Sequence, residues 1–198
     1  MKKERLKLLN DRIIREYSNE KIIIGHGNLN SSIILIGEAP GAKEIEIGEP
    51  FVGQAGKHLE EFIQILNIKR EDIYITNVVK YRPTKENPKT GRLSNRTPSS
   101  KEIDKFREYL YEEIDIINPK IVVTLGNIPL KAIFNEDLKI GQIHGNIMGK
   151  QIKGIDYNVF PLYHPAAIIY RRELKDVYIS DLLELKKEIN YFLKTVDI

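Results

Sequence analysis

Four short apolar runs, each ending at a glycine or a polar residue, constrain the fold of this chain more than any other feature. They occupy residues 32–37, 73–77, 121–126 and 158–163, and helical patterns separate them along the chain. Strands that alternate with helices in this way predict βαβ units and a sheet that helices cover on both faces. The sequence therefore predicts an α/β fold, a three-layer α/β/α sandwich around a central, mostly parallel four-stranded sheet.

Amphipathic patterns predict the helices of the outer layers, because apolar residues recur there at helical spacing. These helices are expected over residues 3–17, 54–66, 99–117, 128–134 and 173–193. No internal repeat or interdomain linker interrupts the chain, and a hydrophobic content of 41% is sufficient for one core. We therefore expect a single domain over residues 1–198.

The composition excludes several classes of protein and of site. The chain has no cysteine, which excludes disulfides, thiolate metal sites and cysteine nucleophiles. No run approaches the roughly 18 to 20 apolar residues that a membrane span needs. We expect a monomer in the cytoplasm, with no membrane partner, no metal site and no cofactor.

Positive charge is concentrated in one segment. The net charge is only +3, but residues 80–101 carry seven basic side chains against one acid, Glu86. Such a patch is typical of a surface that meets phosphates, and a solvated loop is an equally good interpretation of a charge run alone. Prolines and glycine in the segment predict a loop. The DNA contacts expected from it are Lys80, Arg82, Lys85, Lys89 and Arg92.

Side chains suited to chemistry follow the predicted strands. Glu38, Asn77 and His164 stand at strand ends, and Glu44 and Phe51 lie in the loop after the first strand. Ligands of parallel sheets bind at the carboxyl ends of the strands. A carboxylate, an amide, an imidazole and an aromatic ring suit a nucleobase, and they also suit many other polar ligands.

The order of four motifs makes this interpretation more specific. They are Gly37-Glu-Ala-Pro-Gly41, Pro50-Phe-Val-Gly-Gln-Ala-Gly56, Ile75-Thr-Asn-Val-Val-Lys80 and Tyr163-His-Pro-Ala-Ala167. In this order they resemble the family 4 branch of the uracil-DNA glycosylase superfamily, over roughly residues 25–183. The resemblance implies a monofunctional enzyme of base excision repair. Such an enzyme hydrolyses the N-glycosidic bond of deoxyuridine in DNA, releases uracil and leaves an abasic site.

The resemblance also implies roles for the site residues. Phe51 would stack on the extruded uracil, and Asn77 would read its O4 and N3–H edge. His164 would stabilise negative charge near uracil O2. Glu38 and Glu44 would orient the attacking water or shape the wall near uracil C5, and which does which stays open. Two further base contacts are implied, at Gly37 and Ala39.

The segment after His164 is implied to hold the duplex open. Ile168 or Ile169 would fill the gap that the flipped base leaves, and packing in the core is an equally good interpretation of either isoleucine. Arg171 and Arg172 would contact the phosphates beside this wedge.

The chain departs from the family at several positions. Most family 4 members bind a four-iron cluster through four cysteines, and this chain has none. Tyr81 and Phe106 stand where two of them are expected, so we predict aromatic packing in place of the metal brace. Ile45 stands where the family often has Asp. The connection over residues 80–101 also looks longer than usual.

Two alternative functions stay open. The lost cluster and Ile45 suit a non-catalytic or weakly active protein that binds uracil-containing or damaged DNA. A roomier pocket would suit a glycosylase for another deaminated base such as hypoxanthine. His26, His58 and His144 are interpreted as structural or surface residues, with His58 on a helix near solvent. No lysine of the motifs is placed as a Schiff-base nucleophile, which favours a monofunctional enzyme.

Overall fold

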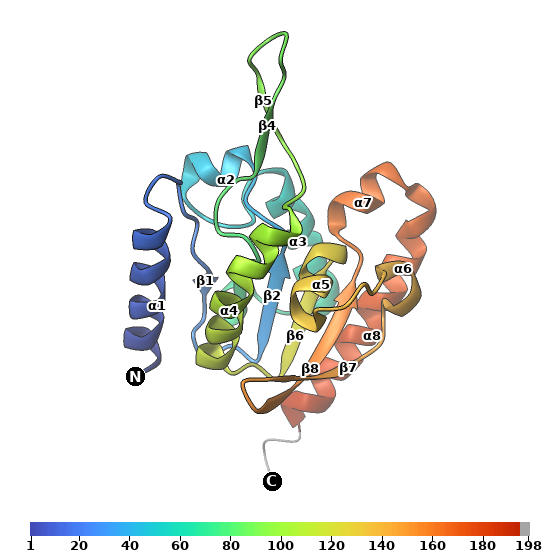
Figure 1. Ribbon diagram of the computed structural model, residues 1–198. Helices are drawn as coiled ribbons and strands as arrows, with labels where there is room; N and C mark the ends of the chain where they lie inside the picture. The colour runs from blue at the N-terminus through green and yellow to red at the C-terminus, as the bar shows by residue number, and fades with distance from the viewer. Residues whose placement is uncertain (195–198) are drawn as a thin grey trace.

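A sheet with strand order β1-β3-β2-β6-β8-β7 forms the middle layer of the computed structural model (Figure 1). Its four central strands are parallel and are the four that the sequence predicts. They are β2 (Ile33–Gly37), β3 (Tyr74–Asn77), β6 (Ile121–Leu125) and β8 (Ile155–Leu162). Two antiparallel strands at the edges, β1 (His26–Gly27) and β7 (Met148–Ile152), correct the predicted strand number from four to six.

The structure describes residues 1–194. Within this range six side chains are not described: Gln54, Ala55, Ile169, Tyr170, Arg172 and Lys194. Among the residues described, no helix is long and apolar enough to cross a membrane.

Alternation along β2 explains the three layers. Ile34 and Ile36 point into one core with the helices α1 (Lys2–Glu16), α4 (Ser100–Ile117) and α5 (Asn127–Phe134). Ile33 and Leu35 point into a second core with α3 (Gln54–Leu66) and α8 (Lys175–Lys194) on the opposite face. Successive side chains of a strand face opposite sides, so one strand contributes to both cores. The predicted α/β/α sandwich is confirmed.

Short elements connect these layers. The helical ones are α2 (Ala42–Ile47), η1 (Arg70–Asp72), α6 (Ile140–Ile143), α7 (Pro165–Tyr170) and η2 (Arg172–Leu174). The segment 80–101 is only partly the predicted loop, because β4 (Thr84–Glu86) and β5 (Leu93–Asn95) pair antiparallel within it. This hairpin projects beyond the end of the sheet at which α2 and α7 lie (Figure 1).

A buried ion pair joins the end of β3 to α4. The Lys80 ammonium lies 2.5 Å from the Glu113 carboxylate, and the two side chains are 1% and 2% exposed. Glu113 also accepts hydrogen bonds from the hydroxyls of Tyr74, at 2.9 Å, and Thr76. An added Cβ at Gly25 would lie 2.3 Å from Glu113, so glycine is needed there for the carboxylate to fit. The prediction that Lys80 contacts DNA is wrong, because its charge is neutralised inside the protein.

Removal of one partner of this pair should strongly destabilise the fold. Lys80→Met leaves the Glu113 carboxylate buried without its counter-charge, and we expect the free energy of unfolding to fall by about 3 to 5 kcal/mol. Lys80→Met combined with Glu113→Leu should recover at least half of that loss. Urea unfolding of both variants measures this.

Arg5→Met provides the matched control, since Arg5 forms an exposed pair with Asp115 at 2.6 Å. It should cost less than about 1 kcal/mol. Equal losses for Arg5→Met and Lys80→Met would contradict the structural role of the buried pair.

Candidate functional site

A cavity of about 320 Å³ opens at the carboxyl ends of the parallel strands, and we call it the strand-end cavity. The loop after β2, the end of β3 and the segment after β8 supply most of its wall. Its lining includes six of the predicted site residues: Glu38, Ala39, Glu44, Phe51, Asn77 and His164. The structure thus brings together residues that are up to 126 positions apart in the sequence.

Gly37 makes the close approach of Phe51 and Asn77 possible. Gly37 pairs with Asn77 in the register of β2 and β3, so both lie at the same edge of the sheet. A Cβ added at Gly37 would lie 2.4 Å from Asn77 Oδ1 and 2.6 Å from Phe51 Cζ. The amide and the ring therefore occupy the space above a residue without a side chain. Any larger residue at position 37 would displace one of them.

The backbone of Phe51 is held in an unusual conformation. Its φ of 55° lies in the left-handed region, which residues other than glycine rarely adopt. Its N–H donates to Glu44 Oε1 at 2.5 Å, and Arg70 Nη2 donates to its carbonyl at 3.3 Å. The ring is only 4% exposed. These contacts fix one flat apolar wall of the cavity.

Asn77 presents an unused amide to this wall. The side chain is 3% exposed, and its Nδ2 has no hydrogen-bond partner among the residues that the structure describes. A buried donor without a partner costs about 1 to 3 kcal/mol, which a polar ligand would recover. Asn77 is therefore suited to bind a ligand that accepts a hydrogen bond.

His164 is arranged as a neutral hydrogen-bond donor. It is half-buried at the start of α7, where its Nδ1 accepts a hydrogen bond from the N–H of Ala166 at 3.1 Å. Burial and the nearby His58 ring lower the pKa of His164, so the imidazole is neutral at neutral pH. Because Nδ1 accepts, the proton is assigned to Nε2, and that N–H is available to a ligand.

Glu38 and Glu44 differ in what surrounds their carboxyl groups. Glu44 is buried, and its two oxygens accept the N–H groups of Gly41, at 2.6 Å, and Phe51. It therefore braces the loop that carries Phe51. The Glu38 carboxyl has no hydrogen-bond partner within the described part of the chain and lines the cavity. Burial raises the pKa of Glu38, and it also raises that of Glu44 against the opposing effect of its two hydrogen bonds.

The sequence analysis did not place His58 and Asn95 at the site, although both line the strand-end cavity. His58, interpreted as a helix residue near solvent, is only 19% exposed at its side chain and lines the cavity on α3. The helical position of His58 was recognisable, but the direction of its ring was not. Asn95 reaches the cavity from β5, where its Oδ1 accepts from Arg82 Nε at 2.6 Å. Nothing in a run of basic and polar residues distinguishes this asparagine.

The predicted DNA-contacting residues lie in different settings. Lys85, Lys89 and Arg92 are exposed on the β4–β5 hairpin, and Arg171 is exposed after α7. Ile168 is partly buried and packs against the core, beside residues of α3 and α8. Arg82 is half-buried and donates to Asn95 at the base of the hairpin. The predictions for Ile169 and Arg172 concern side chains outside the described ones.

A second cavity, of about 450 Å³, lies beside the first and shares Glu38 and His164 with it. Gly126, Asn127 and Arg171 also line it. The two cavities together form a recess that runs along the carboxyl ends of the central strands. An extended ligand with one group in the strand-end cavity can continue into this recess.

Aromatic rings occupy the place where the family resemblance implies a cluster. The ring of Phe106 lies 4.5 Å from that of Tyr17 and 5.7 Å from that of Tyr81, measured between centroids. The chain has no thiolate to ligate iron, so these residues do not fit a four-cysteine cluster. Among the described residues no group of three or more His, Asp or Glu side chains could hold a metal ion either.

Comparison with known proteins agrees with this geometry. A model of the uracil DNA glycosylase superfamily matches residues 24–193. The chain is 38% identical over 165 residues to the type-4 uracil-DNA glycosylase of Archaeoglobus fulgidus, an alignment covering 81% of this chain and 78% of that protein. It is 36% identical over 162 residues to the type-4 enzyme of Pyrobaculum aerophilum, with coverages of 80% and 78%. For that of Thermotoga maritima the identity is 35% over 175 residues, with coverages of 85% and 83%. The chain therefore belongs to the uracil-DNA glycosylase superfamily, as the order of its motifs predicts.

Proposed function

We propose that this protein is a monofunctional uracil-DNA glycosylase that hydrolyses the N-glycosidic bond of deoxyuridine in DNA. Its products are free uracil and an abasic site, the first step of base excision repair. The observation that carries the proposal is the unpartnered buried amide of Asn77 beside the Phe51 ring, in a cavity that His164 also lines. The relatives named type-4 uracil-DNA glycosylase support the same activity. The proposal includes action as a monomer, in the cytoplasm and without a cofactor.

Recognition begins when the nucleotide leaves the stack, because the bond to be cut cannot be reached inside a duplex. The Phe51 ring stacks on the base. The Asn77 amide accepts from uracil N3–H and donates to O4, whereas cytosine presents the reverse pattern at these atoms. Cytosine would leave the buried amide without its hydrogen bonds, and the cost of this makes cytosine bind less well than uracil.

Bond cleavage places negative charge on the departing uracil and positive charge on the sugar. The neutral His164 donates its Nε2–H toward uracil O2, where that negative charge accumulates. Glu38 orients the water that attacks C1′, since its carboxyl group is the uncommitted one of the two glutamates. Glu44 acts as a positioning residue through Phe51. The proton released by the water passes to solvent through the Glu38 carboxylate, and the released uracil anion takes up one proton from solvent, so hydrolysis balances.

The reaction ends without strand cleavage. Lys43 is the one lysine among the described residues that line the strand-end cavity, and its ammonium pairs with Glu46 at 2.9 Å. Borohydride added during turnover should therefore trap no protein–DNA adduct. A trapped adduct would contradict the monofunctional mechanism.

The proposed activity is tested with a labelled oligonucleotide that contains one uracil, followed by alkali, beside matched thymine and hypoxanthine substrates. We expect alkali-labile breaks at uracil alone. His164→Ala should slow single-turnover release by about 10²- to 10³-fold, as loss of an oxyanion donor does. His26→Ala changes an exposed histidine on β1 and should have no effect. DNA binding without base release by the unaltered protein would overturn the glycosylase proposal.

Asn77→Ala should abolish the discrimination between uracil and cytosine and lower the rate of uracil release at least tenfold. A bidentate base contact is worth about 1 to 3 kcal/mol, and its loss lowers both the base discrimination and the rate of release. Asn158→Ala is the matched control, because Asn158 lies on β8 at the other end of the sheet. An unchanged rate in Asn77→Ala would refute the role of the amide.

The pH dependence should separate the two glutamates. Burial raises the pKa of Glu38, so this group takes up its proton at a higher pH than an exposed glutamate, and release should slow as pH falls through that value. Glu38→Gln should lower the rate by about 10²-fold or more and remove this acid limb. Glu44→Gln should weaken substrate binding and keep the limb. The opposite pattern in single-turnover pH profiles would assign the water to Glu44.

A further inference from the structure

The β4–β5 hairpin, residues 84–95, is an exposed arm that the proposed reaction does not use. It projects from the end of the sheet where α2 and α7 lie, which is also the end with the strand-end cavity (Figure 1). Every residue from 85 to 95 is exposed. At about 3.3 Å per residue the arm extends about 17 Å from Thr84 to Lys89. We call this segment the hairpin arm.

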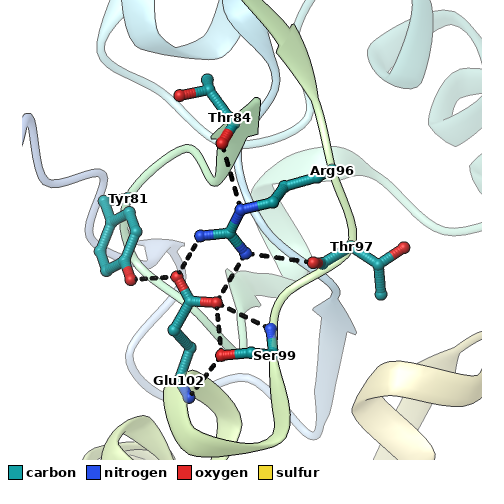
Figure 2. Close-up of polar contacts among 6 residues, drawn as sticks. All are labelled: Tyr81, Thr84, Arg96, Thr97, Ser99 and Glu102. Atoms are coloured by element: carbon teal, nitrogen blue, oxygen red, sulfur yellow. Dashed lines mark hydrogen bonds and ion pairs between the residues drawn. The ribbon is translucent and has the colours of Figure 1, made fainter. Parts of the chain in front are cut away.

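The base of the hairpin arm is fixed by one guanidinium group (Figure 2). Arg96 donates to the carbonyl of Thr84 at 3.1 Å and to both oxygens of Glu102, at 2.7 and 2.8 Å. Glu102 also accepts from the hydroxyl of Tyr81. Arg96 holds the pKa of Glu102 well below its usual range, so the carboxylate stays charged. The two ends of the arm are thereby tied to the start of α4.

One face of the hairpin arm is basic. Lys85 lies opposite Ser94, and the N–H of Asn87 donates to the carbonyl of Arg92 at 3.0 Å. Since side chains alternate along a strand, Lys85 and Arg92 point to the same face, and Lys89 lies in the turn between the strands. These three cations form no ion pair within the part of the chain that the structure describes. They are available to phosphates.

The opposite face differs in character. Glu86, the one acid of the hairpin arm, lies opposite the exposed Leu93 on that face. The arm thus has a cationic side for the sugar-phosphate backbone and a side with an apolar residue. Two strands lie about 4.8 Å apart, and the major groove of B-DNA, about 12 Å wide, admits such a two-stranded ribbon.

The arm is also placed next to the nucleotide that reacts. Asn95, at its base, lines the strand-end cavity, and an added Cβ at Gly41 would lie 3.8 Å from its Nδ2. A DNA strand with one nucleotide in that cavity must therefore pass the base of the arm. Its neighbouring base pairs then lie within the reach of the arm, which corresponds to about five base-pair steps of 3.4 Å.

Resting on the proposed function, we propose that the hairpin arm docks in the major groove of duplex DNA beside the flipped nucleotide and makes the enzyme selective for uracil in duplexes. The basic face lies along one phosphate backbone, and the turn with Lys89 reaches furthest from the cavity. Single-stranded DNA has no groove to receive the hairpin arm, so the arm contributes less to its binding.

The test compares single-turnover uracil release from one oligonucleotide, single-stranded and annealed to its complement. In the shortened variant Asn-Gly replaces residues 86–93 and joins Lys85 to Ser94, a hydrogen-bonded pair that a two-residue turn can close. A second variant, Lys85→Gln with Lys89→Gln and Arg92→Gln, keeps the hairpin. In both, the ratio of duplex to single-strand rates should fall about tenfold or more, and in the second the salt slope of duplex binding should drop by about 2 to 3.

Docking in the major groove can be measured directly as protection of guanine N7, a major-groove atom, from methylation. The unaltered protein should protect guanines within about five base pairs of the uracil on one side, and the shortened variant should not. The control removes three exposed charges near the other end of the sheet: Lys69→Gln, Lys120→Gln and Lys153→Gln. It should change neither readout.

The outcomes separate the two proposals. An unaltered protein that releases no uracil from either substrate contradicts the proposed function, while N7 protection still reports on docking. Release with an unchanged rate ratio, or equal losses on both substrates, overturns the docking of the hairpin arm. Absent N7 protection overturns it as well.

Discussion

The ion pair between Lys80 and Glu113 ties the end of β3 to α4 inside the protein, and both the cavity and the hairpin arm depend on that junction. Asn77 lies three residues before Lys80, so the pair fixes the strand end that carries the Asn77 amide of the strand-end cavity. Tyr81 follows at once and contacts both Phe106 and Glu102 on α4. Breaking a buried ion pair costs much free energy, so the chain that follows β3 is held in one conformation. The same short stretch thus supports the pocket on one side and the arm on the other.

The sequence was sufficient to predict the sandwich and most of the strand-end cavity, for a physical reason. Short β-branched runs between amphipathic helices allow few arrangements, and parallel strands bring their carboxyl ends to one edge. Glu38, Asn77 and His164 each stand at such an end, so their convergence needs no knowledge of distant contacts. Their chemical roles remain predictions. The sequence analysis missed β1 and β7 of this sheet because both are edge strands without a clear apolar run.

Long-range partners decided the features that could not be predicted. Lys80 looks like its exposed neighbours in a basic run, and only Glu113, far along the chain, shows that it is buried. The sequence leaves open whether Glu44 orients water or shapes the cavity wall, because its oxygens bind backbone N–H groups that come near only after the loop has folded. The direction of the His58 ring depends on how α3 packs. The hairpin was hidden because charged and polar residues with few apolar ones resemble a loop.

The left-handed backbone of Phe51 has a consequence for the thermodynamics of base binding in the proposed reaction, in which this ring stacks on the base. Holding an aromatic residue at a φ of 55° costs on the order of 1 kcal/mol or more, and the bonds from Glu44 and Arg70 offset this cost when the chain folds. The ring is therefore in place before any base arrives, and little conformational entropy is lost on stacking. Most of the stacking free energy is then available to oppose the unstacking of the nucleotide from its neighbours. In the proposed reaction, rigidity acquired during folding in this way would lower the cost of extracting one base from DNA.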